Sequence, residues 1–264
     1  MFGKRTWASF AALTAAALLA ACSPAPEAPL AVVEAPAVVP NPGVDPEVLE
    51  AAIATIEEAT GTELGLALFD GSSILTRGSI ASLPAWSTIK IPISFAALRH
   101  CDYNEDYLED LISAAIEISD NDATDLLWAC LQEPGGAEML VRREIGSRVD
   151  VAWGRTPWPF ATQARYAWEL SQRDDLEDNV IIGHMRHIDK EQTWGLGNLG
   201  IPFKGGWGDV DADGSWQSRQ MGFGKLGGVT YGIAIGAVSK DGSFQATTDA
   251  LDALAKVLAS FNET

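Results

Sequence analysis

Two residues three positions apart, Ser87 and Lys90, have the types and the spacing needed for covalent chemistry. They stand just before an apolar run at 91–98 that favours a buried helix. Positions i and i+3 lie on the same face of a helix, so the Lys90 amine can reach the Ser87 hydroxyl. A serine hydroxyl is a weak nucleophile, which a desolvated lysine with a lowered pKa can activate. Because Ser-x-x-Lys also occurs by chance on solvated helical turns, the pair needs partners elsewhere in the chain.

A second polar segment, Ser119-Asp120-Asn121, separates an expected helix at 105–118 from another at 123–131. All three residue types are good helix caps and turn formers, which explains the segment without any function. Beside a nucleophile, however, the Ser119 hydroxyl could relay a proton and the Asn121 amide could hold a substrate. The two interpretations differ only in whether Ser87 lies close by.

Hydrophobic periodicity and turn signals predict the order helix, strands, several helices, strands, helix. Helices are expected at 46–60, 91–98, 105–118, 123–131, 135–145, 156–171 and 249–261. Strands are expected at 63–69, 73–77, 201–208, 216–223 and 229–238, and the glycine-rich strand character begins at Gly195. The first helix has the clearest limits, since Asp45 is a good N-cap, Pro46 suits the first turn and Gly61 ends the pattern.

The amino terminus has the composition of an export signal rather than of a folded domain. Lys4 and Arg5 precede about 15 apolar residues, and Leu-Ala-Ala before Cys22 resembles a bacterial lipobox. We expect residues 1–21 to be a lipoprotein signal peptide and Cys22 to be lipidated. A plain secretory signal and a membrane-spanning helix are the alternatives, although the apolar stretch is short for a bilayer. Residues 22–45 are rich in Ala and Pro and predict an extended tether, leaving 46–264 as the folded domain.

Charge and cysteine content restrict the partners. With 18 basic and 36 acidic residues and no basic cluster, the chain is a poor nucleic-acid binder. We expect an exported monomer, held outside the cytoplasm at the bacterial membrane by acyl chains rather than by charge. Once Cys22 is lipidated, Cys101 and Cys130 remain, and export permits a disulfide between them. Two buried free thiols are the other possibility.

Three motifs together resemble a known family. Ser87-x-x-Lys90, Ser119-Asp120-Asn121 and Lys204-Gly205-Gly206 have the order and context of the Ser-x-x-Lys, Ser-Asp-Asn and Lys-Thr-Gly motifs of class A β-lactamases and penicillin-binding proteins. The resemblance covers about residues 46–262. It implies an α/β (α+β) fold of the β-lactamase and DD-peptidase type, with an antiparallel sheet, terminal helices packed on one face and a reduced all-helical lobe on the other. It implies no cofactor and no metal.

The same resemblance implies catalytic roles for four residues. Ser87 would attack a carbonyl to form an acyl-enzyme, and Lys90 would be its base. Ser119 would relay a proton towards the leaving nitrogen, helped by the charge of Lys204 on a facing strand. These residues would act on β-lactams, D-Ala peptides of the cell wall or small esters.

Substrate-binding roles follow for another four residues. Asn121 would bind a substrate amide, and the backbone N–H groups of Ser87 and Trp207 would form an oxyanion hole. Lys204 with Gly205 and Gly206 would receive the substrate carboxylate. Gly205 departs from the family, however, because it replaces the usual hydroxyl residue and so removes one carboxylate ligand.

Two further departures concern the cleft and turnover. The interval from Ser87 to Ser119 is shorter than in class A enzymes, so a segment that borders the substrate cleft is largely missing. No Glu-x-x-Leu-Asn segment, which carries the deacylating glutamate in that family, occurs between Asn121 and Lys204. Glu144 and an aspartate at 150 are nearby acids without that motif. We therefore expect slow hydrolysis of an acyl-enzyme.

Some patterns have a structural explanation that we favour. The Asp-rich segment at 209–214 begins like a calcium-binding EF-hand loop, but its twelfth position is Gln220, so a hairpin turn is the better interpretation. His184 and His187 are spaced like metal ligands but have no third partner nearby, which favours a solvated helix face. Several tryptophans near the motifs could line a sugar or peptide cleft, although most should pack in the core.

Three functions compete on these grounds. A serine hydrolase with an acyl-enzyme mechanism is the first. A catalytically weak or inactive lipoprotein that binds the cell wall or envelope on the same fold is the second, and a metal-dependent envelope protein using the Asp-rich loop is the third. Covalent labelling of Ser87 by an acyl donor would separate the first two.

Overall fold

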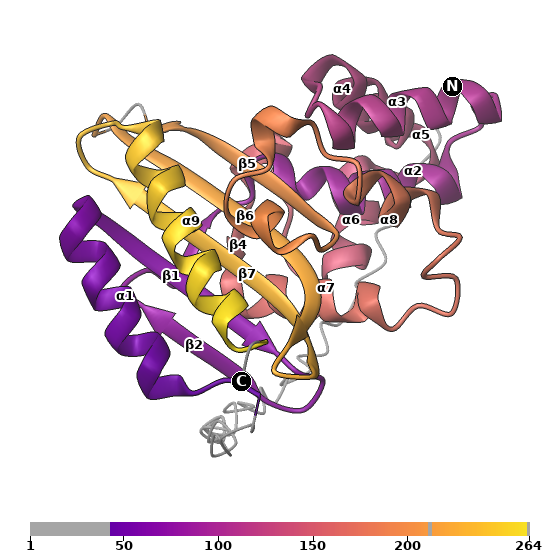
Figure 1. The fold of residues 1–264 in the computed structure, drawn as a ribbon. Helices are drawn as coiled ribbons and strands as arrows, with labels where there is room; N and C mark the ends of the chain where they lie inside the picture. Colours follow the sequence, from indigo (N-terminus) through magenta and orange to yellow (C-terminus); the bar gives the residue numbers. More distant parts are fainter. Residues whose placement is uncertain (1–42, 211–212, 263–264) are drawn as a thin grey trace, which may run out of the picture. The chain divides into compact units, whose positions relative to one another are not determined.

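An antiparallel sheet organises the computed structural model, which describes residues 43–210 and 213–262 (Figure 1). The predicted signal peptide, Cys22 and the tether up to residue 42 lie outside the described residues. The sheet contains β1 (Thr62–Phe69), β2 (Ile74–Gly78), β5 (Phe203–Val210), β6 (Ser215–Leu226) and β7 (Val229–Ser239), in the spatial order β2-β1-β7-β6-β5. A separate pair is formed by β3 (Ser82–Pro84) and β4 (Pro157–Pro159).

Helices connect and cover these strands. The α-helices are α1 (Pro46–Thr60), α2 (Lys90–His100), α3 (Glu105–Glu117), α4 (Asn121–Cys130), α5 (Gln132–Gly135), α6 (Ala137–Ile145), α7 (Phe160–Ser171), α8 (Val180–Met185) and α9 (Phe244–Ser260). Short 3-10 helices are η1 (Trp86–Ile89), η2 (Trp153–Arg155), η3 (Lys190–Gln192) and η4 (Gly195–Leu199). Within the described ranges no helix is long and apolar enough to cross a bilayer.

The sheet is covered on both faces. The terminal helices α1 and α9 lie side by side across one face, and α7 packs against β7, β1 and β6 on the other (Figure 1). Contact with α7 is close at Gly232, where a Cβ would collide with the carbonyl of Ala164. The expected α/β class, with an antiparallel sheet and both terminal helices on one face, is confirmed.

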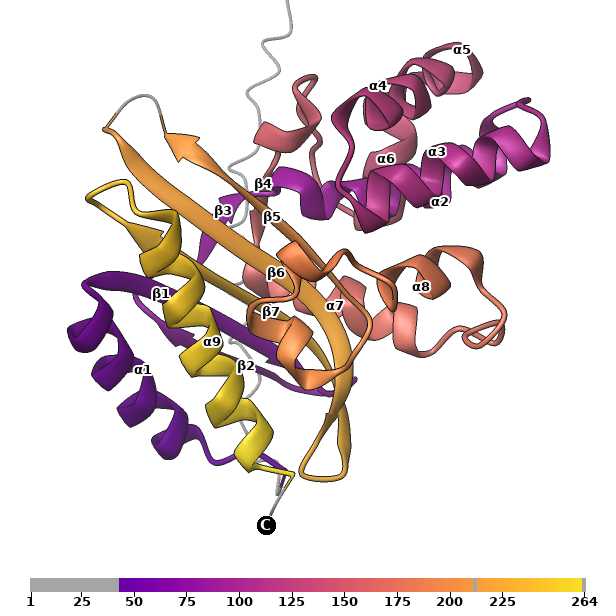
Figure 2. The ribbon, with the colours of Figure 1, turned by 45° about the horizontal axis from the view of Figure 1, so that its top comes forward.

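A group of helices beside the β5 edge carries the site. Figure 2 shows α2 to α6 gathered there, with α2 in contact with α3, α4, α6 and α8. Every residue of α2 from Lys90 to Ala97 is buried, which explains the apolar run in the sequence. A helix surrounded by other helices has no solvent face, so it needs apolar residues on all sides.

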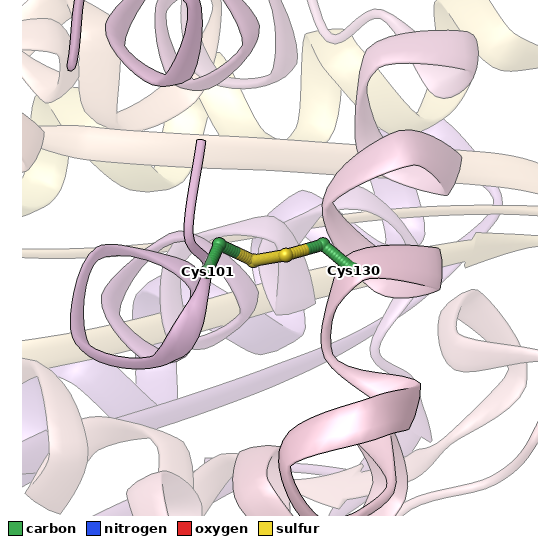
Figure 3. The surroundings of a disulfide bond; sticks show 2 residues. All are labelled: Cys101 and Cys130. Atoms are coloured by element: carbon green, nitrogen blue, oxygen red, sulfur yellow. A yellow bond between two sulfur atoms is a disulfide. The ribbon is translucent and has the colours of Figure 1, made fainter. Parts of the chain in front are cut away.

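A disulfide joins the ends of two helices in this group. Cys101 follows α2 and Cys130 ends α4, and their sulfurs are bonded (Figure 3). The bond closes a loop over a sequence separation of 29 residues. In the chain-entropy model, closing such a loop stabilises the fold by about 3 to 4 kcal/mol. The sequence leaves open a disulfide or two buried free thiols, and the structure contains the disulfide.

Local signals set most element boundaries. The Asp45 side chain accepts from the N–H groups of Glu47 and Val48, and Gly61 ends α1 with a φ of 67°.

Three expectations about element boundaries are wrong. The helix expected at 156–171 begins only at Phe160, because Pro157 and Pro159 favour extended backbone and their segment pairs with β3.

The other two corrections concern the carboxyl-terminal part. The glycine-rich character from residue 195 does not begin as strand, since Gly195–Leu199 forms η4 and β5 starts at Phe203. The last helix begins at Phe244 rather than at 249, because the Ser243 hydroxyl accepts from the Ala246 N–H and caps it. In both cases a local turn or cap decided the boundary.

Candidate active site

Ser87 lies on a strained turn between β3 and α2. The preceding residue, Trp86, has a φ of 47°, which side-chain-bearing residues rarely adopt. The turn is held by hydrogen bonds from the Ala85 N–H to the Thr156 carbonyl (2.7 Å) and from the Thr88 N–H to the Ala85 carbonyl (3.1 Å). Strain of this kind persists only where the surroundings fix it, and it is concentrated at functional sites.

The edge strand β5 packs directly against this turn. A Cβ at Gly206 would lie 2.5 Å from the Ser87 nitrogen, so only glycine allows the strand to approach this closely. The approach brings Trp207, the next residue of β5, to the pocket that contains Ser87. The backbone N–H groups of Ser87 and Trp207 thus belong to adjoining segments, as the predicted oxyanion hole requires.

Lys90 reaches the Ser119 segment from the first turn of α2. Its ammonium donates to the Ser119 carbonyl (2.6 Å), the Asp120 carbonyl (3.1 Å) and Asn121 Oδ1 (2.8 Å), with Ser119 Oγ at 3.4 Å. Ser119 is itself strained, with a φ of 60°. No hydrogen bond from Lys90 to Ser87 occurs in the described structure, although catalytic hydrogen bonds often tighten only when substrate binds.

The protonation of Lys90 is tuned by its surroundings. Burial lowers the pKa of Lys90 from its usual 10.5 to about 7, while the nearby Asp120 and Asp125 carboxylates oppose this shift. A lysine with a pKa near 7 is neutral in a large fraction of molecules at neutral pH. It can therefore accept a proton from a nucleophile one helical turn away.

Ser119 connects Lys90 to a second buried lysine. Lys204 is fully buried on β5, and its ammonium donates to Ser119 Oγ (3.1 Å) and to the Gly205 carbonyl (3.0 Å). Burial, and secondarily the charge of Lys90, holds the pKa of Lys204 well below its ordinary value. The Ser119 hydroxyl thus stands between two lysines that disfavour each other's charge, which is an arrangement suited to passing a proton.

A pocket of about 420 Å³ opens at Ser87. The residues that line it are Trp86, Ser87, Asn121, Ala152, Trp153, Gly154, Arg155, Trp207, Gly208 and Asp209. Trp86 forms one wall, since Gly208 leaves room for its ring on one side and the Arg155 guanidinium lies 4.5 Å from the ring centre. The volume is within the range of small-molecule sites.

Trp153 covers the Lys90 side of this pocket. The Lys90 ammonium lies 5.4 Å from the centre of the Trp153 ring, and the indole N–H donates to Asp125 Oδ1 (2.9 Å). The Trp153 ring therefore lies in the segment around residue 150, where the family resemblance implies a deacylating acid. Neither acid considered there lines the pocket, since Glu144 pairs with Arg99 (2.6 Å) and Asp150 accepts from the Ala152 N–H.

The single carboxylate among the pocket-lining residues belongs to Asp209, on β5. Successive side chains of a strand point to opposite faces. Gly208 faces the Trp86 ring, so the Asp209 side chain is directed to the face that carries Trp207, whose ring meets that of Trp194 edge to face with centres 6.1 Å apart. The strand geometry thus directs Asp209 away from the Trp86 wall.

Three residues predicted to receive the substrate carboxylate, Lys204, Gly205 and Gly206, do not line the pocket. Gly205 faces the ring of Trp194 on the opposite side of β5, Gly206 packs against the Ser87 turn, and the Lys204 ammonium donates to Ser119 Oγ. Conversely, Trp153 and Arg155 line the pocket although the sequence analysis did not select them. No motif surrounds them, and their signal was only a tryptophan and an arginine in a loop.

Two of the patterns that we assigned to structure can be followed in the described residues. Asp213 and Gly214 turn the chain between β5 and β6, and their N–H groups donate to the Val210 carbonyl. No group of three metal-ligating side chains occurs in the described part of the chain. The expectation of a solvated face for both histidines is wrong for His184, which is half-buried and pairs with Glu117 of α3 at 2.7 Å.

The fold is similar to that of class A β-lactamases. One such enzyme from Bacteroides cellulosilyticus aligns with a TM-score of 0.63 at 14% identity, over 81% of this chain and 98% of that chain. The Mycobacterium abscessus enzyme gives 0.62 at 15% identity over 82% and 100%. An ancestral class A β-lactamase gives 0.61 at 17% identity over 80% and 99%.

No protein-family model and no curated protein matches the sequence. At such low identities the structural likeness establishes the fold alone. The fold that the three motifs predicted is confirmed, whereas the roles of the motif residues remain predictions based on the geometry above.

Proposed function

We propose that this chain is an envelope-anchored serine hydrolase that is acylated at Ser87 by β-lactams, D-Ala peptides or small esters. The observation that carries the proposal is the chain of groups from Lys90 through Ser119 to Lys204 beside the pocket of Ser87. The anchor is the lipidated Cys22 predicted from the sequence. The fold shared with class A β-lactamases supports the reaction class.

In the proposed reaction, neutral Lys90 accepts the Ser87 hydroxyl proton as Oγ attacks the substrate carbonyl carbon. The C–O bond forms, and the carbonyl electron pair moves to oxygen, where the N–H groups of Ser87 and Trp207 receive it. Collapse breaks the bond to the leaving group. Ser119 gives its proton to a leaving nitrogen and is reprotonated from the lysine pair.

Release of the acyl group is expected to be slow. The pocket contains Trp153 beside Lys90, and none of the lining residues is a carboxylate directed at Ser87. Incubation with excess benzylpenicillin, followed by removal of free drug, should leave an adduct that decays over many minutes rather than milliseconds. Multiple rapid turnovers in a steady-state assay would contradict this expectation, and no adduct with several acyl donors would favour the non-catalytic binder.

Arg155 is expected to select acyl donors that carry a negative charge. It is the single basic residue among the pocket-lining side chains, and its guanidinium is held over the Trp86 ring. Because a hydrogen bond to a charged group contributes about 1.5 to 3 kcal/mol, Arg155→Gln should slow acylation by anionic donors about tenfold or more. Acylation by neutral nitrophenyl esters should change little.

Arg165→Gln is the matched control for this measurement. Arg165 is also exposed and also lies over an aromatic ring, 4.3 Å from the centre of Phe69, but it does not line the pocket. Rate constants for anionic and neutral donors should be measured for both variants. If Arg155→Gln lowers the acylation rate constants for anionic and neutral donors equally, Arg155 does not recognise the charge of the donor.

A further inference from the structure

Arg219, on β6, is fully buried and pairs with no carboxylate in the part of the chain that the structure describes, although its guanidinium lies 5.0 Å from the centre of the Phe160 ring. Its guanidinium donates to the carbonyls of Leu83 (2.7 Å), Pro84 (3.0 Å) and Trp158 (3.0 Å), and to the side-chain oxygen of Gln163. Each of these acceptors is uncharged, and Nε has no partner among the described residues. Taking an unpaired charge out of water is costly, so a chain that keeps one needs a reason for it.

The acceptors of Arg219 belong to the segments that carry Ser87. Leu83 and Pro84 lead into the strained turn, and Trp158 lies on the strand that pairs with them. Beyond Arg219, the Gln163 amide donates to Thr88 Oγ1 (2.9 Å), and that hydroxyl donates to the Ala85 carbonyl (2.5 Å). Arg219 and Gln163 together therefore link Leu83 and Pro84, which lead into the turn, to Thr88, which follows the nucleophile.

The register of the sheet also places Arg219 beside the predicted oxyanion hole. Arg219 is the cross-strand partner of Gly206, and directly paired residues project to the same face of a sheet. A Cβ at Gly206 would point to that face and lie 2.5 Å from the Ser87 nitrogen. Burial lowers the pKa of Arg219 only to about 9, so the group is still charged at neutral pH. A charge in this buried region is weakly screened.

We infer that Arg219 is a positioning residue for the Ser87 turn, and that its unpaired positive charge stabilises the oxyanion that forms during acylation. This inference rests on the proposed function. A purely structural arginine would act only through its hydrogen bonds. An electrostatic role requires in addition that the charge stays uncompensated, which explains why the acceptors around it are neutral.

The substitution Gln163→Glu separates these two roles. It keeps the shape and the acceptor oxygen at Arg219 but places a carboxylate against the guanidinium, and it removes the N–H donor to Thr88 Oγ1. The folded protein should be as stable as the wild type or more stable in thermal unfolding. The acylation rate constant at saturating benzylpenicillin should fall on the order of tenfold or more, while the dissociation constant of the drug stays unchanged. A rate within twofold of the wild type would overturn the electrostatic role.

Two controls accompany this variant. Gln172→Glu makes the same change at an exposed glutamine that caps α7, and its acylation rate should equal the wild-type rate. Thr88→Val removes the hydrogen bond from Gln163, and with it the bond from the Thr88 hydroxyl to the Ala85 carbonyl, without changing charge. It should still cost clearly less than Gln163→Glu, and an equal cost would overturn the electrostatic role, because the lost hydrogen bonds would then explain the whole effect.

Arg219→Gln provides a second test if Gln163→Glu does not fold. It retains an N–H donor for the carbonyls but no charge, and folded Arg219→Gln protein should show the same loss of acylation rate. Wild-type acylation in that folded variant would overturn the inference. If the wild-type protein itself forms no adduct with benzylpenicillin or nitrophenyl esters, the proposed function is wrong. If the wild type is acylated and the variants are acylated at the same rate, only the role of Arg219 is wrong.

Discussion

Ser87→Ala is expected to abolish covalent labelling by benzylpenicillin and by nitrophenyl esters. The substitution removes the only atom that the proposed reaction acylates, so the rate of adduct formation should fall on the order of 10³-fold or more. The half-buried Ser87 hydroxyl makes no hydrogen bond in the described structure, so thermal stability should change little. Adduct formation is measured by intact mass over time.

Ser94→Ala is the matched control for this substitution. Ser94 lies on α2, two turns beyond Ser87, and its buried hydroxyl has no hydrogen-bond partner in the described structure. Its replacement by alanine removes an unsatisfied polar group and should leave labelling intact. Persistent labelling of Ser87→Ala at the wild-type rate would place the nucleophile elsewhere.

Lys90→Met is expected to have the second-largest effect, a loss of about 10²-fold or more in acylation rate. Neutral Lys90 is the proposed base, and its pKa is about 7 in the folded protein. The wild-type acylation rate should therefore rise as pH increases from 6 to 8 and level off above that range. Lys90→Met should lose this dependence, and Lys256→Met, at an exposed position on α9, should keep it.

The same pKa shift predicts a stability profile with a definite sign. Lys90 has a pKa near 7 when folded and its usual 10.5 when unfolded, so the unfolded chain binds more protons between these values. The free energy of unfolding should therefore rise with pH across this window. Lys90→Met should reduce that slope in chemical denaturation at several pH values.

The pH dependence of acylation is a separate test of Lys90. A wild-type acylation rate that does not change with pH would exclude Lys90 as the titrating base.

The sequence predicted the fold well where short signals act locally. Asp45 and Gly61 limited the first helix correctly, and the three motifs pointed to the fold that the structure shows. One failure arose where tertiary pairing overrides local preference, at Pro157 and Pro159, which form β4 and pair with β3 instead of starting a helix. A periodic pattern does not reveal which segment a neighbouring strand will capture.

The candidate site was predictable only in part, for a similar reason. Ser87, Lys90, Ser119 and Lys204 stand in recognisable motifs, and the fold brings them together. Trp153 and Arg219 have no motif, because their importance comes from what surrounds them rather than from sequence neighbours. An arginine is usually exposed, so no sequence pattern predicted a fully buried one among neutral acceptors.

Peptide mapping of the wild-type protein after brief exposure to benzylpenicillin is the decisive test of acylation at Ser87. We expect one acyl group per molecule, located on the peptide that contains Ser87 and persisting after free drug is removed. Unmodified protein after exposure to benzylpenicillin and to activated esters, or a label on another residue, would contradict it.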